Sequence, residues 1–316
     1  PDSPTRRVGG QPLKNFVQHT HLGRLYSLDK AQSFGELEDW IAKVNKEVGE
    51  VYFTVELKYD GLTISVTYRD GEFVGAATRG NGVVGEDVTE QVKTIRTVPL
   101  TIPYKGTCEL QGEGIMHLSA LNRYNAKHPD EPLKNARNAA AGAIRNLDPK
   151  VTAERTLDVV FHSSGYHDNL DVHSQWELNE FFKSCHMATN AVFERVKTFD
   201  EIKAIIEHIA EIRPTLDFLI DGVVIKVDDF AVREELGYTD KFPKWAVAFK
   251  FDAEQVQTTL EGVEWQVGRT GKLTPIGKLA PVDLCGATIR RATLNNFGDI
   301  TRKRLKLGGS IFVRRS

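Results

Sequence analysis

The sequence predicts an α+β fold in which antiparallel sheets are flanked by helices and followed by a small β-barrel. Three patterns predict it. Alternating strands follow one another through short turns early in the chain, amphipathic helices separate the later strands, and short strand-like runs with glycine and proline turns follow residue 251. The 316 residues suit two domains. We therefore expect domains 1–252 and 253–316, the second truncated at its C-terminus.

The helices are predicted from apolar residues that recur at a period of 3.6. The first covers residues 34–48, with Ser33 as its N-cap and Glu36 completing a capping box. Further helices are expected at 117–127, 134–146, 175–187 and 199–211.

The strands are predicted from a period of two. In residues 51–60 one face is apolar, and the other carries Glu56, Lys58 and Asp60. This strand therefore presents charged groups on its polar face. The Asp70-Gly71 pair indicates a hairpin turn. Further strands are expected at 62–68, 73–78, 157–163, 220–227 and 245–251.

Composition excludes several classes of protein. Hydrophobic residues make up 41% and charged residues 27%, which supports a core and excludes general disorder. There is no apolar run long enough to span a membrane, and the first residues show no secretory signal. Cys108, Cys185 and Cys285 are far apart and odd in number, which excludes a disulfide framework and a CxxC zinc pair. We expect a cytoplasmic protein without a membrane partner.

Charge is balanced overall, at −2, but is unevenly distributed. Residues 241–316 contain 14 lysines and arginines against 6 aspartates and glutamates, a net charge of +8. Such a basic stretch fits either a contact surface for a polyanion or an ordinary solvated surface. Charge alone leaves both interpretations open.

Three lysines lie in strand-like segments and are candidates for chemistry. Lys58 precedes Asp60 and Gly61 in a K-x-D-G string, while Lys226 and Lys250 interrupt apolar strands. A free lysine amine has a pKa of about 10.4, so a nucleophilic lysine needs burial or nearby cations. Three converging lysines would hold a phosphate. Taken singly, each also fits an edge lysine whose ammonium reaches solvent.

Longer strings carry a resemblance to a known family. Residues 56–61, 78–80, 112–113, 220–227 and 246–251 resemble the motifs of the nucleotidyltransferase superfamily of ligases and capping enzymes. A closer similarity, to bacterial NAD⁺-dependent DNA ligases, rests on strings at 1–10, 78–89, 135–149 and 265–271. The resemblance implies a nucleotidyltransferase (adenylation) domain of ATP-grasp-like antiparallel sheets and an OB-fold domain.

The resemblance also implies a reaction. In the family, the lysine at the position of Lys58 attacks the α-phosphorus of NAD⁺ and releases nicotinamide mononucleotide. The AMP then passes to the 5′-phosphate of a DNA nick, and the 3′-hydroxyl displaces it. Lys226 and Lys250 match the lysines that hold the adenylate and stabilise the transferring phosphoryl group. Asp60 and Asp221 match acids near the reacting centre.

Nucleotide-binding residues are implied in the same way. Glu113 matches the glutamate that binds the ribose, Arg79 an arginine by the ribose and phosphate, and Arg213 an arginine near the nucleotide. His162 stands where the family often stacks a tyrosine on adenine. The adenine pocket is expected to be lined by Ser27, Leu28 and the backbone of Glu56 and Leu57.

The implied partners are nicked double-stranded DNA and NAD⁺. Arg137 and Arg145 match helix arginines that face the nick phosphate and the AMP, and guanidinium groups suit phosphate. They also fit plain surface charges. Magnesium is the implied metal, because it takes carboxylates together with substrate phosphates. No residue of this chain is assigned as a metal ligand.

Compared with the family, the chain is expected to start after a helical domain that grips nicotinamide mononucleotide. It is also expected to end before a four-cysteine zinc finger, so zinc is expected only beyond Ser316. On this interpretation the chain binds the adenosine half of NAD⁺ but transfers AMP and seals nicks poorly. A monomer is expected.

Two alternatives remain. An ATP-dependent ligase or capping-type nucleotidyltransferase would prefer ATP to NAD⁺. A non-catalytic DNA-binding module would use its basic C-terminal part, would not need Lys58 or Glu113, and would bind DNA with strong salt dependence.

Overall fold

The computed structural model describes residues 15–251, 255–268, 271, 273–284 and 287–314. The chain divides into two compact units, residues 1–251 and residues 252–316. Some sequence features considered above lie outside the described residues: residues 1–10, Arg269, Thr270 and Cys285. No helix in the described part is long and apolar enough to cross a membrane.

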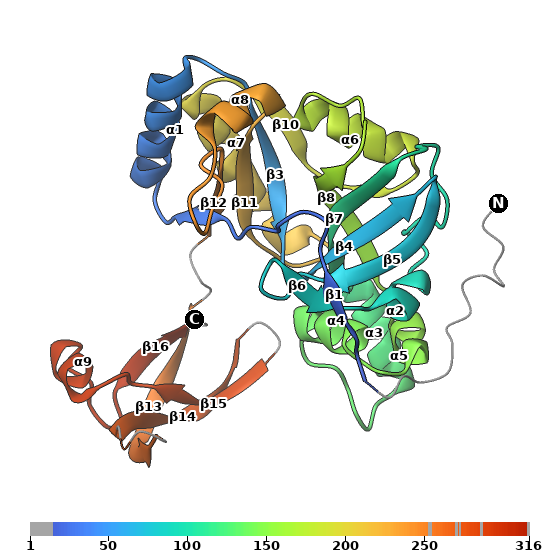
Figure 1. Ribbon diagram of the computed structural model, residues 1–316. Coiled ribbons are helices and arrows are strands. Elements are labelled where there is room, and N and C mark those ends of the chain that lie inside the picture. The colour runs from blue at the N-terminus through green and yellow to red at the C-terminus, as the bar shows by residue number, and fades with distance from the viewer. Residues whose placement is uncertain (1–14, 252–254, 269–270, 272, 285–286, 315–316) are drawn as a thin grey trace. The chain divides into compact units, whose positions relative to one another are not determined.

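The first unit contains two five-stranded sheets (Figure 1). The first sheet is antiparallel except for one parallel pair, β12 with β2, and its hydrogen-bonded order is β10-β3-β11-β12-β2. Its strands are β2 (Asp29–Ala31), β3 (Phe53–Tyr59), β10 (Phe193–Val196), β11 (Ile220–Val227) and β12 (Ala246–Lys250).

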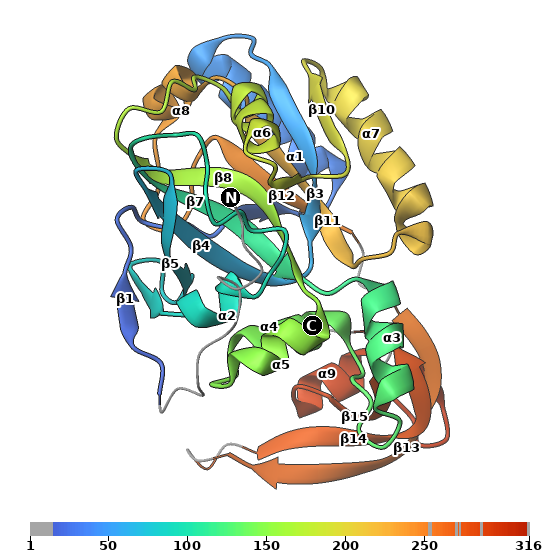
Figure 2. The ribbon, with the colours of Figure 1, turned by 90° about the vertical axis from the view of Figure 1, so that its right-hand side faces the viewer.

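Two helices, α1 (Phe34–Val48) and α7 (Phe199–Ile212), cover one face of this sheet (Figure 2). Apolar side chains from both helices join alternate residues of β3, β11 and β12 in one buried core: Leu37, Ile41, Val44, Ile202, Ile206, Ile209, Val55, Leu57, Val223, Ile225, Val247 and Phe249. The intervening residues face the opposite way. The predicted alternation of β3 is therefore confirmed, with Glu56 and Lys58 on its polar face.

The start of α1 differs from the prediction in one bond. Ser33 is the N-cap, as predicted, and its side chain accepts a hydrogen bond from the Glu36 backbone N–H at 3.2 Å. The Glu36 carboxylate, however, accepts from the backbone N–H of Gln32 at 2.7 Å, one residue before the cap. The predicted capping box is therefore wrong, because the extended backbone before Ser33 brings the Gln32 N–H within reach.

The second sheet has the order β5-β4-β7-β8-β9. Its strands are β4 (Leu62–Arg69), β5 (Glu72–Thr78), β7 (Thr107–Ile115), β8 (Asp158–His167) and β9 (Ala188–Thr189). Nearby segments form a small pair of strands, β1 (Gln18–Thr20) with β6 (Val84–Glu86). The predicted hairpin turn between β4 and β5 is confirmed, because Asp70 and Gly71 both have positive φ, at 52° and 82°.

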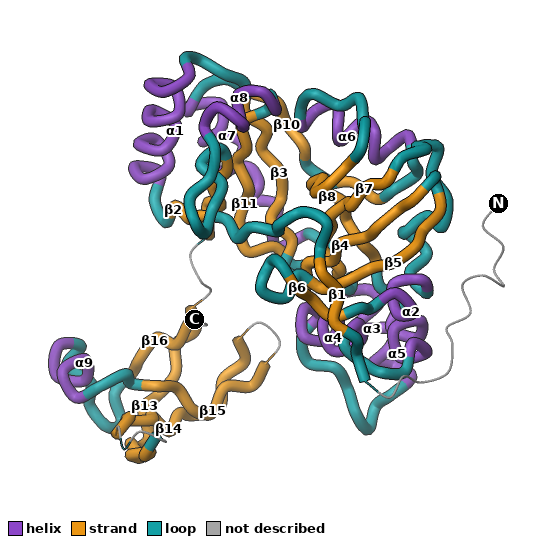
Figure 3. Tube along the Cα trace, viewed as in Figure 1, coloured by secondary structure: helices purple, strands orange, loops and turns teal. Residues whose placement is uncertain are grey.

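Helices bury the outer face of the second sheet (Figure 3). The core there includes Ile64, Val66 and Tyr68 of β4, together with alanines of α4. The remaining helical elements of the first unit are α2 (Thr89–Lys93), α3 (Leu118–Lys127), α4 (Ala136–Ile144), α5 (Pro149–Arg155), α6 (Gln175–Ser184), α8 (Phe230–Leu236) and the 3₁₀ turn Arg213–Thr215.

The main element that sequence reasoning missed is β7. It is central to its sheet, pairing with both β4 and β8. Its sequence, TCELQGEGI, mixes charged residues with two glycines, so neither its alternation nor its length stands out. Tertiary pairing on both sides, not local propensity, makes this segment a strand.

The second unit is a four-stranded antiparallel sheet of order β15-β14-β13-β16 with one short helix. The elements are β13 (Gln255–Val267), β14 (Leu273–Leu284), β15 (Ala287–Thr293), α9 (Phe297–Arg302) and β16 (Ser310–Arg314). Within the described residues β15 and β16 do not pair, so the sheet is open where a barrel was expected. Two of the strands are also longer than the short runs predicted, because hairpin pairing continues through their glycine and proline positions.

Candidate active site

A cavity of about 1070 Å³ lies within the first unit. Its walls come from the polar face of β3, β11 and β12 and from β4, β5, β7 and β8 of the second sheet. Charged and polar groups therefore line it from both sides. Most of the predicted site residues are among the lining residues: Ser27, Leu28, Glu56, Leu57, Lys58, Arg79, Glu113, Arg137, Arg145, His162, Lys226 and Lys250.

Lys58 lies near the end of β3, directly opposite Gly222 of β11. Its ammonium forms an ion pair with Asp221, with Nζ at 2.9 Å from Oδ1 and 3.2 Å from Oδ2. Lys250 reaches the same carboxylate, with Nζ at 3.6 Å from Oδ2. One aspartate thus holds two lysines together at the cavity wall, and both side chains remain partly exposed.

The turn after Lys58 is tightly packed against β7. A Cβ atom on Gly61 would lie 2.2 Å from the carbonyl oxygen of Gly114 and 3.0 Å from the side chain of Glu113. No larger residue fits there without moving the backbone. Glycine in the K-x-D-G string therefore lets the Lys58 strand approach the strand that carries Glu113.

Glu56 and Lys226 form a buried ion pair on the same cavity wall. Their side chains are 2% and 5% exposed, and Lys226 Nζ lies 2.5 Å from Glu56 Oε1. Lys226 also donates to the carbonyl oxygen of His162 at 2.8 Å. Burial lowers the pKa of Lys226, while the charge of Glu56 acts in the opposite direction. The pair keeps one cation fixed at the base of the cavity.

Glu113 lies on β7 and lines the same cavity as Lys58. Its carboxylate accepts a hydrogen bond from the Thr63 hydroxyl at 3.1 Å. Burial raises the pKa of Glu113 to about 7, although Lys58, the Thr63 hydroxyl, Arg137 and Arg79 each act to lower it. A carboxylate with a free acceptor oxygen in such a site can bind sugar hydroxyl groups.

Glu113 therefore predicts a pH-dependent stability. From its ordinary value of 4.5 up to about 7, the folded chain holds a proton on Glu113 that the unfolded chain has lost, so stability falls as pH rises through this window. Replacing Glu113 with Gln removes this effect. We expect Glu113→Gln to be more stable than wild type at pH 8, by on the order of 2 kcal/mol, and equal to it at pH 4. Urea unfolding at both pH values measures the difference in the free energy of unfolding between Glu113→Gln and wild type. The same difference at pH 4 and pH 8 would contradict a raised pKa for Glu113.

Three arginines line the cavity with defined partners. Arg79 donates to the Ser27 hydroxyl at 3.0 Å. Arg137, on α4, forms an ion pair with Asp60 at 2.9 Å. Arg145, at the end of the same helix, lies 3.9 Å from a carboxylate oxygen of Glu86, and its side chain is 57% exposed. The two helix arginines thus present guanidinium groups at the cavity mouth.

His162 lies in the cavity wall as a neutral ring. Burial, together with the charges of Lys226 and Lys58, lowers its pKa to about 3. Its Nδ1 lies 2.9 Å from the Ser163 hydroxyl. A neutral aromatic ring beside several cations provides a surface on which a base can stack.

This set of groups points to one kind of ligand. The lysines and arginines described above suit phosphates, the Glu113 carboxylate suits a ribose, and the uncharged His162 ring suits a base. The Lys58 amine lies among these groups. Two family descriptions match the chain: NAD-dependent DNA ligase adenylation domain over residues 13–254, and NAD-dependent DNA ligase OB-fold domain over residues 257–316.

The chain belongs to the NAD-dependent DNA ligase family. It is 50% identical over 321 residues to a DNA ligase of Alkaliphilus metalliredigens and 51% identical over 319 residues to one of Alkaliphilus oremlandii. Each match covers 100% of this chain and 48% of the relative, so the chain spans about half the length of these relatives. Among solved structures, it is similar to Pmar-Lig_PreS3 at 16% identity and a TM-score of 0.49, over 91% of this chain and 62% of that chain.

Membership of the ligase family confirms the resemblance, and the structure adds where each site residue lies. Asp60 and Asp221 contact cavity lysines and arginines without being lining residues themselves. Arg213 does not line the cavity. It lies in the 3₁₀ turn after α7, with its guanidinium 5.3 Å from the centre of the Phe251 ring. Arg213 was expected near the nucleotide, and the structure does not place it among the residues that line the cavity.

Several lining residues of this ligase-family chain were not found from the sequence. Tyr26 and Tyr238 stack on each other with ring centres 4.7 Å apart, and Trp245 lies edge-on to Tyr238. They come from distant parts of the chain, so no local pattern marks them. Thr63 hydrogen-bonds Glu113 because the two residues face each other in the β4–β7 register. That pairing could have been predicted only if β7 had been recognised as a strand.

Proposed function

We propose that this chain is the nucleotidyl-transfer core of a DNA ligase that uses NAD⁺. The observation that carries the proposal is the position of Lys58, whose amine lies in one cavity with Glu113, Arg79 and the two lysines of neighbouring strands. Membership of the NAD-dependent DNA ligase family supports NAD⁺ as the AMP donor.

In the proposed reaction the Lys58 amine, once deprotonated, attacks the α-phosphorus of NAD⁺. A nitrogen–phosphorus bond forms, the pyrophosphate bond breaks, and nicotinamide mononucleotide leaves with the bonding electrons. Asp221, at 2.9 Å from Nζ, orients the amine. An oxygen of the 5′-phosphate at a nick then attacks the phosphorus of the adduct, so that the nitrogen–phosphorus bond breaks and the Lys58 amine leaves. Attack by the 3′-hydroxyl on the 5′-phosphorus then releases AMP and closes the strand.

The cations around Lys58 would stabilise the reacting phosphate. Lys226 is fixed by Glu56, and Lys250 is held by Asp221, so both charges are preorganised before substrate binds. Arg79 would contact the ribose and phosphate side, and Glu113 the ribose hydroxyl groups. His162 would stack on adenine, beside Ser27, Leu28 and the backbone of Glu56 and Leu57. Arg213, which does not line the cavity, would affect the bound nucleotide only through its positive charge and without direct contact.

The DNA-facing groups are proposed to be Arg137 and Arg145, whose side chains are 52% and 57% exposed. Guanidinium groups at a cavity mouth suit the phosphate at a nick. The OB-fold unit, with the basic stretch of residues 241–316, would contribute further phosphate contacts.

Magnesium would bind mainly through the substrate. Among the described residues around the cavity, no three His, Cys, Asp or Glu side chains bring their ligand atoms together. Asp60 and Asp221 are already paired with basic side chains. A magnesium ion would therefore take phosphate oxygens and water as its main ligands, with at most one carboxylate of the chain, such as that of Glu113. It would neutralise part of the negative charge of the phosphates.

We further propose a monomer that acts in the cytoplasm. Every group assigned above comes from one chain, so no second copy is needed to complete the cavity. Cys108 and Cys185 are free, buried thiols, which suits a reducing compartment.

Calorimetric titration with NAD⁺, AMP and ATP tests the proposal. We expect saturable AMP and NAD⁺ binding that weakens at least tenfold in Glu113→Ala, because the ribose loses its acceptor. Glu38→Ala, on the exposed face of α1, is the matched control and is expected to bind like wild type. Clear preference for ATP would favour an ATP-dependent transferase. Absence of nucleotide binding, with salt-dependent DNA binding retained, would favour a DNA-binding module.

A further inference from the structure

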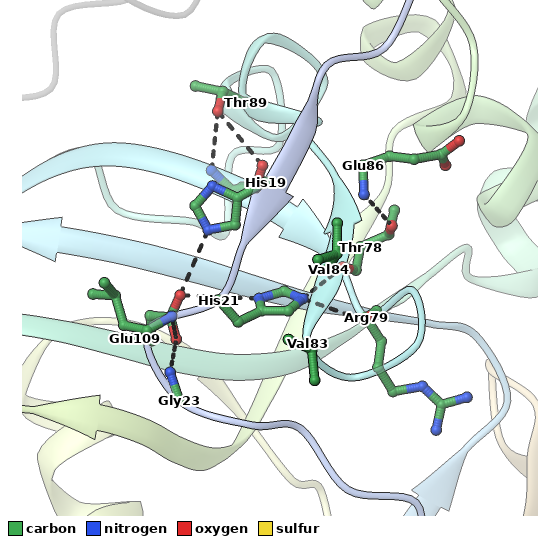
Figure 4. A network of polar contacts seen from close by, with 12 residues as sticks. His19, His21, Gly23, Thr78, Arg79, Val83, Val84, Glu86, Thr89 and Glu109 are labelled. Carbon is green, nitrogen blue, oxygen red and sulfur yellow. Dashed lines mark hydrogen bonds and ion pairs between the residues drawn. The ribbon is translucent and has the colours of Figure 1, made fainter.

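A second polar cluster lies where the N-terminal segment crosses the second sheet (Figure 4), and its residues are not among those that line the cavity. It consists of His19, His21 and Glu109. One ligand atom from each lies within 4.8 Å of the other two, and this is the one such group of three found in the described part of the chain. His19 is at the middle of β1, His21 follows that strand, and Glu109 is on β7.

The ring of His21 is oriented by two backbone carbonyl groups. Its Nε2 lies 3.1 Å from the Thr78 oxygen and 3.2 Å from the Arg79 oxygen, so Nε2 carries the proton and donates it. In the neutral imidazole, Nδ1 then has a lone pair available for a ligand. This buried nitrogen has no hydrogen-bond partner among the residues that the structure describes, and it lies 3.9 Å from Glu109 Oε1.

Glu109 is arranged in a similar way. Its Oε2 accepts hydrogen bonds from the backbone N–H groups of Leu22 and Gly23, at 3.0 and 3.1 Å. Its buried Oε1 has no hydrogen-bond partner within the described part of the chain and points toward both histidines, with His19 Nε2 at 3.6 Å. The side chains of His21 and Glu109 are both 0% exposed.

Two acceptor atoms therefore face each other in a buried space. Such an arrangement is unfavourable unless a cation lies between them. The hydrogen bonds of His21 Nε2 and Glu109 Oε2 match those of known metal sites. In such sites a ligating histidine donates its other N–H to a carbonyl group, and the ligating carboxylate is itself hydrogen-bonded.

We propose that His19 Nε2, His21 Nδ1 and Glu109 Oε1 bind one divalent transition-metal ion, with Zn²⁺ as the preferred ion. Two imidazoles and one carboxylate suit zinc, which takes such ligands at about 2.0–2.2 Å. Tetrahedral ligands at that radius lie about 3.4 Å apart, so the three atoms need to move inward by less than about 1 Å. Water completes the coordination on the side of His19, which is 28% exposed.

The site has a structural role. His21 is bonded to the backbone of Thr78 and Arg79, and Glu109 to the backbone of Leu22 and Gly23. Arg79, Thr78 and the segment from Gly23 onward all line the nucleotide cavity. A bound ion would tie the N-terminal segment to β5 and β7 and so fix one wall of that cavity.

Metal titration of the tag-free chain, after removal of metal by a chelator, tests the proposal. We expect one Zn²⁺ per chain by calorimetry, and visible d–d bands typical of low coordination when Co²⁺ is used instead. His19→Ala is expected to lower the Zn²⁺ affinity at least tenfold. His173→Ala is the matched control, because this exposed histidine has its own carboxylate partner, Asp171, at 2.8 Å, and belongs to no group of three possible ligands in the described residues.

Glu109→Gln serves as a second variant, because its amide oxygen can still accept the bonds of Leu22 and Gly23 while the anionic ligand is lost. It is also expected to lose at least tenfold in affinity. Zinc at 100 times the wild-type dissociation constant should raise the wild-type folded-to-unfolded ratio about 100-fold, and the ratio of each variant about 10-fold at most. Absence of Zn²⁺ and Co²⁺ binding by wild type, or one-to-one binding at wild-type affinity in both variants, would overturn the proposal.

Discussion

Replacing Lys58 with Arg is expected to abolish the covalent AMP adduct, lowering its formation by more than about a thousandfold. The guanidinium stays protonated near neutral pH, so it has no lone pair with which to attack phosphorus. It nevertheless keeps the positive charge beside Asp221, and the cavity should therefore keep its AMP affinity within a few-fold. Loss of the adduct without loss of AMP binding would show that Lys58 is the nucleophile and not merely a cation that binds phosphate.

Intact mass measurement after incubation with a donor detects the adduct. NAD⁺ with Mg²⁺ is one donor. A DNA strand with an adenylated 5′-end is the other, which tests the proposed second step in the reverse direction. Because the measurement only asks whether the adduct is present, AMP transfer to Lys58 can be slow and still be detected. Lys203→Arg, on α7, is the matched control and should retain the adduct. An adduct that persists in Lys58→Arg would show that another residue is the nucleophile.

The largest effect on stability is expected for Glu56→Ala. This change leaves Lys226 buried without its counter-ion, and breaking a buried pair in this way costs about 3–5 kcal/mol. The remaining partners of Lys226, the carbonyl oxygen of His162 and the Ser163 hydroxyl, are neutral and cannot balance the charge. Urea unfolding followed by circular dichroism measures the loss as a lower midpoint at constant slope.

A double variant distinguishes the stranded charge from simple loss of packing. Glu56→Leu combined with Lys226→Met replaces the pair with apolar side chains and should recover most of the lost stability. The carbonyl of His162 still accepts from Gln175 Nε2 at 2.9 Å, so it is not left unbonded. Glu38→Ala is expected to change stability by less than about 0.5 kcal/mol. If the double variant is as unstable as Glu56→Ala, the ion pair is not the cause.

Much of the site was predictable because strand alternation is a local property. Residues 53–59 show which face of β3 is polar, and that alone places Glu56 and Lys58 on the same side. The same reasoning applies to Lys226 in β11 and Lys250 in β12, whose apolar neighbours face the helices. The first helix was likewise predicted with its bounds, because its apolar spacing and its N-cap agree.

The sequence by itself therefore determined the α+β class, the family, and the polar strand faces that carry the lysines. Only the tertiary structure decided which groups meet. Asp221 bridges Lys58 and Lys250, and Glu56 pairs with Lys226, because neighbouring strands have one particular register. The same holds for Arg213, which lies against Phe251, and for the cluster of His19, His21 and Glu109. Register and long-range contacts depend on the packing of the whole sheet, which no local pattern records.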